Sequence, residues 1–333
     1  MISIVLINWN GNRFLSDCLE AIATQSYQPT EILVVDNAST DGSQELLLRE
    51  QRHYHYQLVC NECNLGYCGG ANLGIRQTHG KYILLLNPDV ILDVTFLEQL
   101  FAIAEQNPNF GILTGKLLRF DRHTLDSTGQ FLRKNFSPLE RGYGEPDRGQ
   151  YEQPGFVFSS CGAAAWYRRA MLEDLQLNGE YFDESYFAFY EDLDVGWRAQ
   201  LLGWNAYYVP TAKAYHYRGG GLSEQQRKKH WFESLPFLPS VSFIEKPAFI
   251  QRHILMNRYL TLLKNAAWQE ILPGLPAICS YELLAWGYAL CVRPTLLSTL
   301  RDMLRIFPKL RLKRKEIQRR RVVAPAHIRK YMC

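Results

Sequence analysis

The first 115 residues alternate short runs of β-branched apolar residues with amphipathic stretches at helical spacing. This alternation is typical of βαβ units, in which consecutive strands pair in a parallel sheet. Right-handed crossovers direct such strands the same way, so the loops after them emerge at one edge, where open α/β sheets bind ligands. The pattern predicts strands at residues 2–7, 31–35, 56–60 and 81–86, with helices at 13–25, 43–51 and 69–79 between them.

Polar and turn-forming residues follow each expected strand. Asp and Asn suit loops for reasons unrelated to function, so turn chemistry explains any one cluster equally well. Four clusters that converge on one sheet edge predict a binding site there. The clusters are Asn8-Trp9-Asn10, Asp36-Asn37, Asn64-Leu65-Gly66 and Asn87-Pro88-Asp89.

The sequence pattern changes twice in the remainder of the chain. Residues 116–155 are polar and weakly periodic, which predicts an insertion or a mobile flap over the site. Regular structure is expected again afterwards, with a helix at 191–202 and a strand at 205–209 that precedes His216. Beyond residue 235, Pro-punctuated apolar segments lead to a basic tail, so we expect a domain boundary there.

Six sequence blocks carry a family resemblance in their order and spacing. Together they resemble the successive motifs of family 2 glycosyltransferases of the GT-A fold, and most of all bacterial rhamnosyltransferases of cell-surface polysaccharide synthesis. The resemblance, which covers about residues 1–220, implies an α/β, Rossmann-like, mostly parallel sheet flanked by helices at 1–235. The apolar segments and the basic run predict a C-terminal helical, membrane-associating region at 236–333. The blocks are IVLINWNG, VVDNASTDGS, NLGYCGGANLGI, LLLNPDV, FDESYFAFYEDLDVGWRAQLLGW and YHYRGGG.

The resemblance implies donor-binding roles at this sheet edge. Asp36 matches the family's base-reading aspartate, which accepts the imide N–H of uracil or thymine, and Trp9 offers a flat wall for the same ring. Alternatively, Asp36 caps the helix that begins near Ser43. The stretch 66–72 lacks a G-x-G-x-x-G fingerprint, so its small residues either admit the donor or serve the turn alone. The predicted donor nucleotide site comprises Asn8, Trp9, Asp36, Asn37, Gly66, Asn72 and Asn87.

Asn87-Pro88-Asp89 stands in the place of the family's Asp-x-Asp motif. A diphosphate leaves readily only when its developing charge is neutralised, which a divalent cation does. By resemblance Asp89 holds Mn²⁺ or Mg²⁺, whereas Asn87 lacks the second charge and suits a ribose or water-mediated contact. His216 resembles a late metal ligand of GT-A enzymes, although a lone histidine is often structural, and Arg218 is expected at the diphosphate.

Glu191 and Asp192 open the expected helix at 191–202. Acids suit the first turn of any helix because of its dipole, so their position alone does not establish catalysis. By resemblance Asp192 is the general base that deprotonates the acceptor hydroxyl, and Glu191 is its acceptor-binding neighbour. Asp183 and Glu184 are expected to shape the acceptor pocket and to offer a partner for Arg198.

The C-terminal region combines apolar helices with a basic run. Residues 277–292 are apolar but shorter than the roughly 20 residues of a spanning helix, which favours an interfacial, re-entrant or packed core helix. Residues 309–321 carry eight Lys/Arg and one Glu, a charge segregation that favours the anionic cytoplasmic membrane surface. A solvated basic tail is the alternative. Nucleic acid is not expected as a partner, because no aromatic residues interleave the run.

Eight cysteines at irregular spacing do not suggest a disulfide framework. Cys60, Cys63 and Cys68 lack a second ligand pair at zinc-site spacing, so we expect free thiols in a reducing compartment. The N-terminus has no positively charged segment and only a strand-length apolar run, so we expect no signal peptide. The expected location is the cytoplasm, peripheral on the inner face of the cell membrane.

These features predict an inverting, metal-dependent glycosyltransferase that moves a sugar from a dTDP- or UDP-sugar to a glycan or lipid-linked acceptor. A nucleotidyltransferase is the alternative enzyme, but the loop after residues 2–7 lacks the basic, glycine-rich phosphate motif that it needs. A catalytically silent glycan- or membrane-binding scaffold is the alternative outside enzymes.

Overall fold

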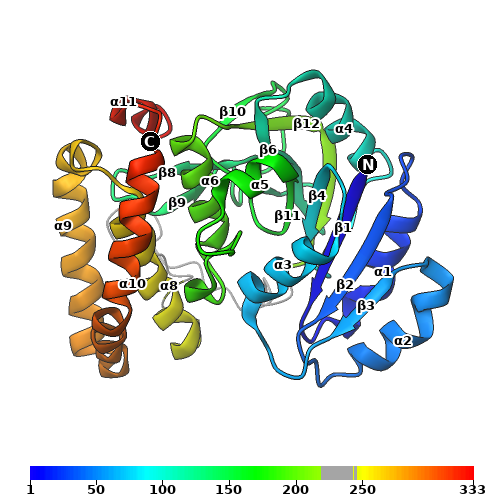
Figure 1. Cartoon of the computed structure of the whole chain (residues 1–333), viewed down its shortest axis with the longest axis horizontal. Helices are drawn as coiled ribbons and strands as arrows, with labels where there is room; N and C mark the ends of the chain where they lie inside the picture. The colour runs from blue at the N-terminus through cyan, green and yellow to red at the C-terminus, as the bar shows by residue number, and fades with distance from the viewer. Residues whose placement is uncertain (219–242, 244–245) are drawn as a thin grey trace. The chain divides into compact units, whose positions relative to one another are not determined.

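The computed structural model describes residues 1–218, 243 and 246–333 (Figure 1). Two compact units make up the chain: residues 1–131 with 140–219, and residues 132–139 with 220–333. The boundary expected after residue 235 lies outside the described residues. The assignment of 132–139 to the second unit was not expected from the sequence.

A ten-stranded sheet forms the centre of the first unit, in the order β10-β12-β6-β11-β4-β1-β2-β3, with β5 on β12 and β7 on β6. β1 pairs in parallel with β2 and β4, and β2 pairs in parallel with β3, which confirms the expected parallel half. The strands are β1 (Ile2–Asn8), β2 (Glu31–Asp36), β3 (Gln57–Cys60), β4 (Tyr82–Leu86), β5 (Val90–Leu92), β6 (Phe110–Arg119), β7 (Leu125–Ser127), β10 (Gly155–Val157), β11 (Ala164–Arg168) and β12 (Asn205–His216).

Helices cover this sheet because their apolar residues recur at helical spacing. In α1 (Asn12–Ala23) the buried Leu15, Cys18, Leu19 and Ile22 form one stripe against the core. In α3 (Gly66–Gln77) a Cβ added at Gly74 would lie 2.2 Å from Val5, so glycine permits the close approach to β1. The helices are α1, α2 (Ser43–Tyr54), α3 (Gly66–Gln77), α4 (Phe96–Gln106), α5 (Arg169–Leu175), η1 (Glu184–Tyr186) and α6 (Glu191–Leu201).

Residues 116–155, which the sequence predicts as an insertion or a mobile flap over the site, contain regular secondary structure. This segment contains the end of β6, then β7, a separate hairpin of β8 (Gln130–Leu132) and β9 (Pro138–Glu140), and the first residue of β10. Its polar residues are partly internal: the fully buried Lys116 lies 3.1 Å from Asp147 and also pairs with Glu152. Buried charges need such partners, so these polar residues stabilise an ordered segment.

His216 also differs from expectation, because it is the last residue of β12 and does not follow a strand that ends at residue 209. Antiparallel pairing with β5 sets His216 opposite Val90. The backbone N–H of Tyr217 donates to the carbonyl of Asp89 at 2.9 Å. Strand pairing therefore brings His216 beside Asp89.

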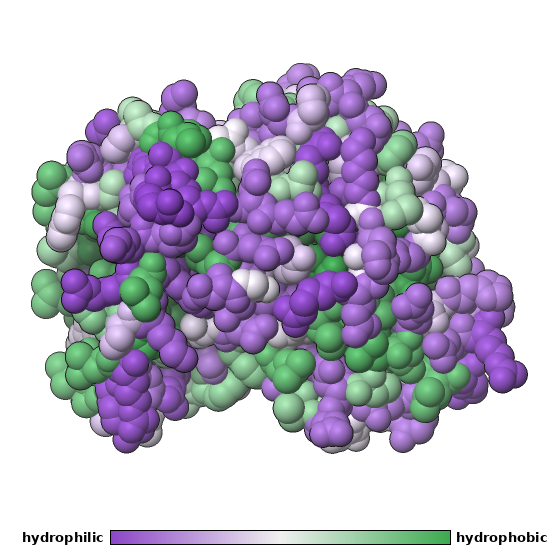
Figure 2. All heavy atoms as spheres, viewed as in Figure 1, coloured by the Kyte–Doolittle hydropathy of each residue, from purple (hydrophilic) through white to green (hydrophobic). Residues whose placement is uncertain are grey.

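The second unit is helical, as expected. Its described elements are α8 (Ala248–Asn265), α9 (Trp268–Cys291), η4 (Pro294–Leu297), α10 (Ser298–Arg320) and α11 (Pro325–Arg329). The apolar stretch 277–292 lies almost entirely within α9, and Figure 2 shows hydrophobic side chains at the surface over this helix. In the described part of the chain no single helix is long and apolar enough to cross a membrane, whereas α9 and Pro294–Arg320, bent by 120°, meet that test as a pair.

The basic tail is a structural part of this unit and not merely a solvated extension. Arg314 donates to the carbonyl of Ala266 at 2.8 Å, and Gln318 donates to that of Asn265 at 2.8 Å. These contacts satisfy carbonyl groups that the end of α8 leaves without helical partners. Because Leu310 and Ile317 are also buried, removing residues from 309 onward would disrupt the unit.

Candidate active site

Asp36 is completely buried at the end of β2. Its Oδ1 accepts hydrogen bonds from Asn8 Nδ2 at 2.7 Å and Ser39 Oγ at 2.6 Å. Its Oδ2 accepts from the backbone N–H of Ser39 at 3.0 Å and from Gln44 Nε2 at 2.7 Å. These four donors match the acceptor capacity of a carboxylate, so Asp36 fastens together the loops after β1 and β2.

Two other residues of the predicted donor site also organise loops. Asn37 Nδ2 donates to the carbonyl of Gly66 at 3.0 Å. The fully buried Asn72 donates to Glu184 Oε1 at 2.9 Å, and its own Oδ1 accepts from the backbone N–H of Phe182 at 2.9 Å. The structure therefore joins Asn72 to the expected acceptor residue Glu184.

Gly66 and Trp9, two further residues of the predicted donor site, differ in their exposure to solvent. Gly66 has φ +71°, and an added Cβ would lie 2.6 Å from Phe187, so the turn requires glycine. Trp9 is 58% exposed, which leaves its ring face available to a planar ligand. Asn87, half-buried after β4, donates its backbone N–H to the carbonyl of Ala163 at 2.9 Å.

Asp89 and His216 form the centre of a charged cluster. His216 Nε2 lies 3.3 Å from Asp89 Oδ2, and His216 Nδ1 lies 2.8 Å from Asp126 Oδ2. Arg218 pairs with the other oxygen of the fully buried Asp126. Sequence reasoning missed Asp126, since nothing near it in the chain marks it as a partner of His216.

In this cluster, ion pairing has a larger effect on the pKa values than burial does. Burial lowers the pKa of His216, but hydrogen bonds to Asp126 and Asp89 raise it to about 9 overall. Burial would raise the pKa of Asp126, but His216 and Arg218 lower it to about 2. Without a cation, the cluster therefore holds a protonated histidine between two carboxylates at neutral pH.

When two ligand atoms each lie about 2.1 Å from one divalent cation and subtend a right angle at it, they are about 3 Å from each other. The distance between His216 Nε2 and Asp89 Oδ2 is close to this value. A carboxylate on the other ring nitrogen is the usual support of a metal-binding histidine, and Asp126 takes that place. Within the described residues no group of three or more His, Cys, Asp or Glu is arranged to hold a metal ion. The donor set fits a cation that takes its remaining ligands from a diphosphate and water.

Asp192 lies at the beginning of α6, where three N–H groups hold its carboxylate. Oδ1 accepts from the backbone N–H of Leu193 at 2.7 Å. Oδ2 accepts from the backbone N–H of Gly162 at 3.0 Å and from Gln130 Nε2 at 2.7 Å. Asp192 is half-buried between the buried residues Glu191 and Leu193, so it is the member of this turn that an incoming hydroxyl can approach.

Glu191 and Asp192 differ in the number of their donors. Burial and the charge of Asp192 raise the pKa of Glu191 well above its ordinary value, and Glu191 Oε2 has no partner among the described residues. Burial also raises the pKa of Asp192, but its three donors oppose the rise. Asp192 is therefore the member that ionises first.

The buried thiol of Cys161 interacts electrostatically both with the cluster around Asp126 and with Asp192. Burial raises the pKa of this thiol well above its ordinary value, with further increases from Glu140, Asp126 and Asp192 and an opposing effect of Arg218. The cluster around Asp126 and the carboxylate of Asp192 therefore act on the same thiol and belong to one electrostatic region.

The acceptor-side residues differ partly from expectation. Asp183 is 5% exposed and accepts from the backbone N–H of Ser185 at 3.1 Å, so it caps the short helix η1. Glu184 is exposed. Arg198 does not pair with either acid, because Asp194 one turn before it on α6 offers a carboxylate at 2.9 Å.

Comparison with known proteins agrees with this architecture. The family model for glycosyl transferase family 2 matches residues 3–176, just over half of the chain. The chain therefore belongs to glycosyl transferase family 2 and is a glycosyltransferase, as the sequence motifs predicted.

Among curated relatives, an N-acetylglucosaminyl-diphospho-decaprenol L-rhamnosyltransferase of Mycobacterium tuberculosis is 26% identical over 247 residues, which cover 66% of this chain and 76% of that protein. The poly-beta-1,6-N-acetyl-D-glucosamine synthase of Staphylococcus epidermidis is 22% identical over 211 residues, which cover 63% of this chain but 48% of the synthase. This chain thus spans about half the length of the synthase.

Solved structures show the same fold. S. aureus TarS in complex with UDP-GlcNAc matches with a TM-score of 0.55 at 17% identity, over 99% of this chain and 89% of TarS. GalNAc-T7 with UDP, GalNAc and Mn²⁺ matches with a TM-score of 0.55 at 11% identity, over 90% of this chain and 58% of GalNAc-T7. These matches confirm the GT-A fold.

Proposed function

We propose that this glycosyltransferase is inverting and metal-dependent, and that it transfers a sugar from a nucleotide-sugar donor to a glycan or lipid-linked acceptor in cell-surface polysaccharide synthesis. The observation that carries the proposal is the carboxylate of Asp192, held by three donors in the same electrostatic region as the Asp89–His216 pair. A silent scaffold has no need of a half-buried, ionisable carboxylate that is held in this way.

The reaction is a single in-line displacement. Asp192 takes the proton of the acceptor hydroxyl as the hydroxyl oxygen attacks the anomeric carbon, and the bond from that carbon to the diphosphate breaks. A divalent cation held by Asp89 and His216 would neutralise the charge that develops on the diphosphate. Asp126 orients His216 through Nδ1, and Arg218 balances the charge of Asp126.

Relatives support the choice of donor and acceptor. The mycobacterial relative is a rhamnosyltransferase acting on N-acetylglucosaminyl-diphospho-decaprenol by name, which favours dTDP-rhamnose and a lipid-linked acceptor. UDP-sugars are the second choice, because the TarS structure holds UDP-GlcNAc. Trp9 is the residue best exposed to cover the base.

A thermal-shift experiment tests the donor and the cation together. A ligand at 100 times its Kd stabilises the folded protein by about 2.7 kcal/mol, so the correct nucleotide sugar should raise Tm by several degrees. We expect a larger shift with dTDP-rhamnose plus Mn²⁺ than with either alone, and a smaller one with UDP-GlcNAc. Equal shifts of Tm with and without Mn²⁺ would contradict metal dependence. In a separate activity assay, release of pyrophosphate from a nucleoside triphosphate would favour a nucleotidyltransferase.

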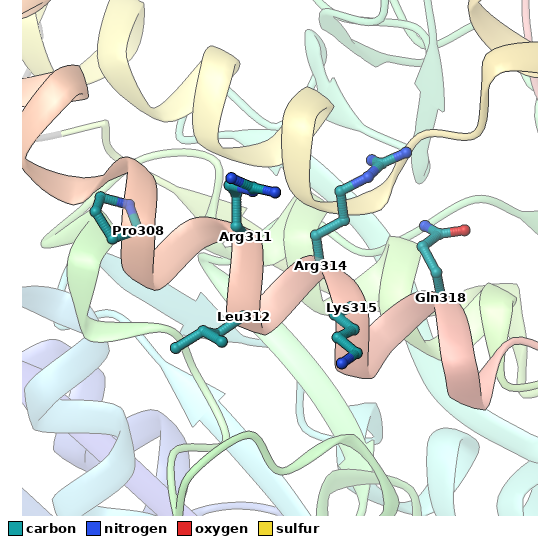
Figure 3. A pocket seen from close by; sticks show the side chains of 6 residues that line it. All are labelled: Pro308, Arg311, Leu312, Arg314, Lys315 and Gln318. Atoms are coloured by element: carbon teal, nitrogen blue, oxygen red, sulfur yellow. The ribbon is translucent and has the colours of Figure 1, made fainter.

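A further part of the proposal is peripheral association of the second unit with the anionic cytoplasmic leaflet. Figure 3 shows the groove along α10 between Pro308 and Gln318, lined also by Arg311, Leu312, Arg314 and Lys315. Arg314 is engaged by carbonyl groups of α8, whereas Arg311, Lys315 and the 69% exposed Leu312 are open to solvent. Exposed cations beside an exposed leucine suit a bilayer surface.

Charge reversal tests this association without disturbing the packed tail. Each Lys or Arg near an anionic surface contributes about 1 kcal/mol, so changing Lys309, Arg311 and Lys315 to Glu should weaken vesicle binding by about 100-fold or more. Sedimentation with phosphatidylserine vesicles measures it. The matched control reverses the exposed Arg49, Arg52 and Arg76, which gives the same net charge and should bind much more tightly than the first triple variant. Equal loss in both variants would mean that α10 is not the contact.

A further inference from the structure

We infer that Gln130 and Glu140 are positioning residues for Asp192, acting from the β8–β9 hairpin; this inference rests on the proposed function. Neither residue belongs to the motifs that carry the family resemblance. They are the first residue of β8 and the last residue of β9, and both belong to the first unit together with Asp192.

A single amide group joins the two carboxylates. Gln130 Nε2 donates to Glu140 Oε1 at 2.7 Å and to Asp192 Oδ2 at 2.7 Å. Each of its two hydrogens therefore has one carboxylate oxygen as its acceptor. Ser127 Oγ donates to the other oxygen of Glu140, which fixes that side chain from β7.

Gln130 is 2% exposed, and its Oε1 has no hydrogen-bond partner among the described residues. An amide that served packing alone would be expected to satisfy its oxygen as well, because a buried acceptor without a partner costs free energy. In this structure both N–H groups of the Gln130 amide donate to carboxylates, and its Oε1 accepts no hydrogen bond from the described residues. The side chain is thus oriented by Glu140 and holds Asp192 in turn.

The charges around Glu140 give this arrangement a second effect. Burial and the charge of Asp192 raise the pKa of Glu140 to about 7, against hydrogen bonds from Ser127 and Gln130 and the charge of Arg218. Cys161 also faces Glu140, and its thiol stays protonated. When Glu140 is ionised, its negative charge favours proton uptake by Asp192, which makes Asp192 a stronger base.

Two variants separate position from charge. Gln130→Met keeps the length of the side chain but cannot donate, and Glu140→Gln keeps an acceptor oxygen for Gln130 but removes the charge. We expect Gln130→Met to lower kcat by about 10–100-fold with an unchanged KM for the nucleotide sugar, since a hydrogen bond to a charged group is lost. Glu140→Gln should lower kcat less and should abolish the rise of the wild-type kcat with pH through about 7. The control is Glu145→Gln on an exposed loop, which should behave as wild type.

Carboxyl ¹³C NMR titration provides a readout that needs no substrate. The wild type should show a carboxyl group titrating near pH 7 that is absent from Glu140→Gln, and Gln130→Met should raise the apparent pKa of Asp192. If transfer is absent from the wild type with every donor while these shifts are found, the proposed function fails and the linkage stands. The inference is overturned if Gln130→Met leaves both kcat and the Asp192 titration unchanged, or if kcat and KM change together with a loss of Tm.

Discussion

Changing Asp192 to asparagine should slow sugar transfer by about 10²–10⁴-fold, the usual contribution of a positioned general base. Asparagine has nearly the same shape, and its amide oxygen can still accept from Gly162 or Gln130, so the beginning of α6 should keep its structure. The donor should bind as before, because the substitution removes proton acceptance and not a donor contact. Steady-state release of the nucleoside diphosphate, together with the donor Kd, measures both effects.

Glu191→Gln is the matched control for this experiment. Burial and the charge of Asp192 raise the pKa of Glu191 well above its ordinary value, which favours the protonated form that glutamine resembles closely. We expect transfer within a few-fold of wild type. Asp194 is a poorer control, because it forms a buried ion pair with Arg198 whose loss would destabilise α6. Near-normal transfer by Asp192→Asn together with a slow Glu191→Gln would assign the base to Glu191.

Asp89→Ala should abolish the stimulation of transfer by Mn²⁺ or Mg²⁺ and leave a rate about 10³-fold lower, because a bound cation contributes several kcal/mol to stabilising the leaving diphosphate. The fold should persist, since Asp89 lies in a half-buried loop and its truncation opens no apolar cavity. Activity against cation concentration, with Tm as the check on folding, provides the test.

Asp121→Asn serves as the control, because Asp121 is an exposed loop aspartate that accepts hydrogen bonds from His123 and Thr124. It should keep the cation response of the wild type. An Asp89→Ala variant that is still stimulated by Mn²⁺ would move the cation site away from Asp89 and His216.

The parallel half of the sheet could be predicted closely from the sequence. Expected strands at 2–7, 31–35 and 81–86 correspond to β1, β2 and β4 within one residue at each end. The family motifs likewise identified Asp89, His216 and Asp192 as residues to examine. Hydrophobic periodicity and chain order lie in neighbouring residues, so they are readable before any tertiary contact is known.

The roles of polar residues were less readable. Asp36 and Asn72 were expected to face the donor, and the structure surrounds both with protein hydrogen bonds. The segment 116–155 was predicted as an insertion or a mobile flap because it is polar and weakly periodic, yet its charged residues pair internally and it contains strands. Composition does not show whether a polar group meets water or another residue.

The family, the order of the elements and the sheet edge of the candidate site could therefore be predicted from the chain alone. The distant partners of the candidate site residues became visible in the folded chain: Asp126 contacts His216, 90 positions away, and Gln130 contacts Asp192, 62 positions away. The physical reason is that hydrogen-bond partners and pKa values depend on burial and on distances of a few ångströms, which strand pairing fixes between residues that are remote in the chain.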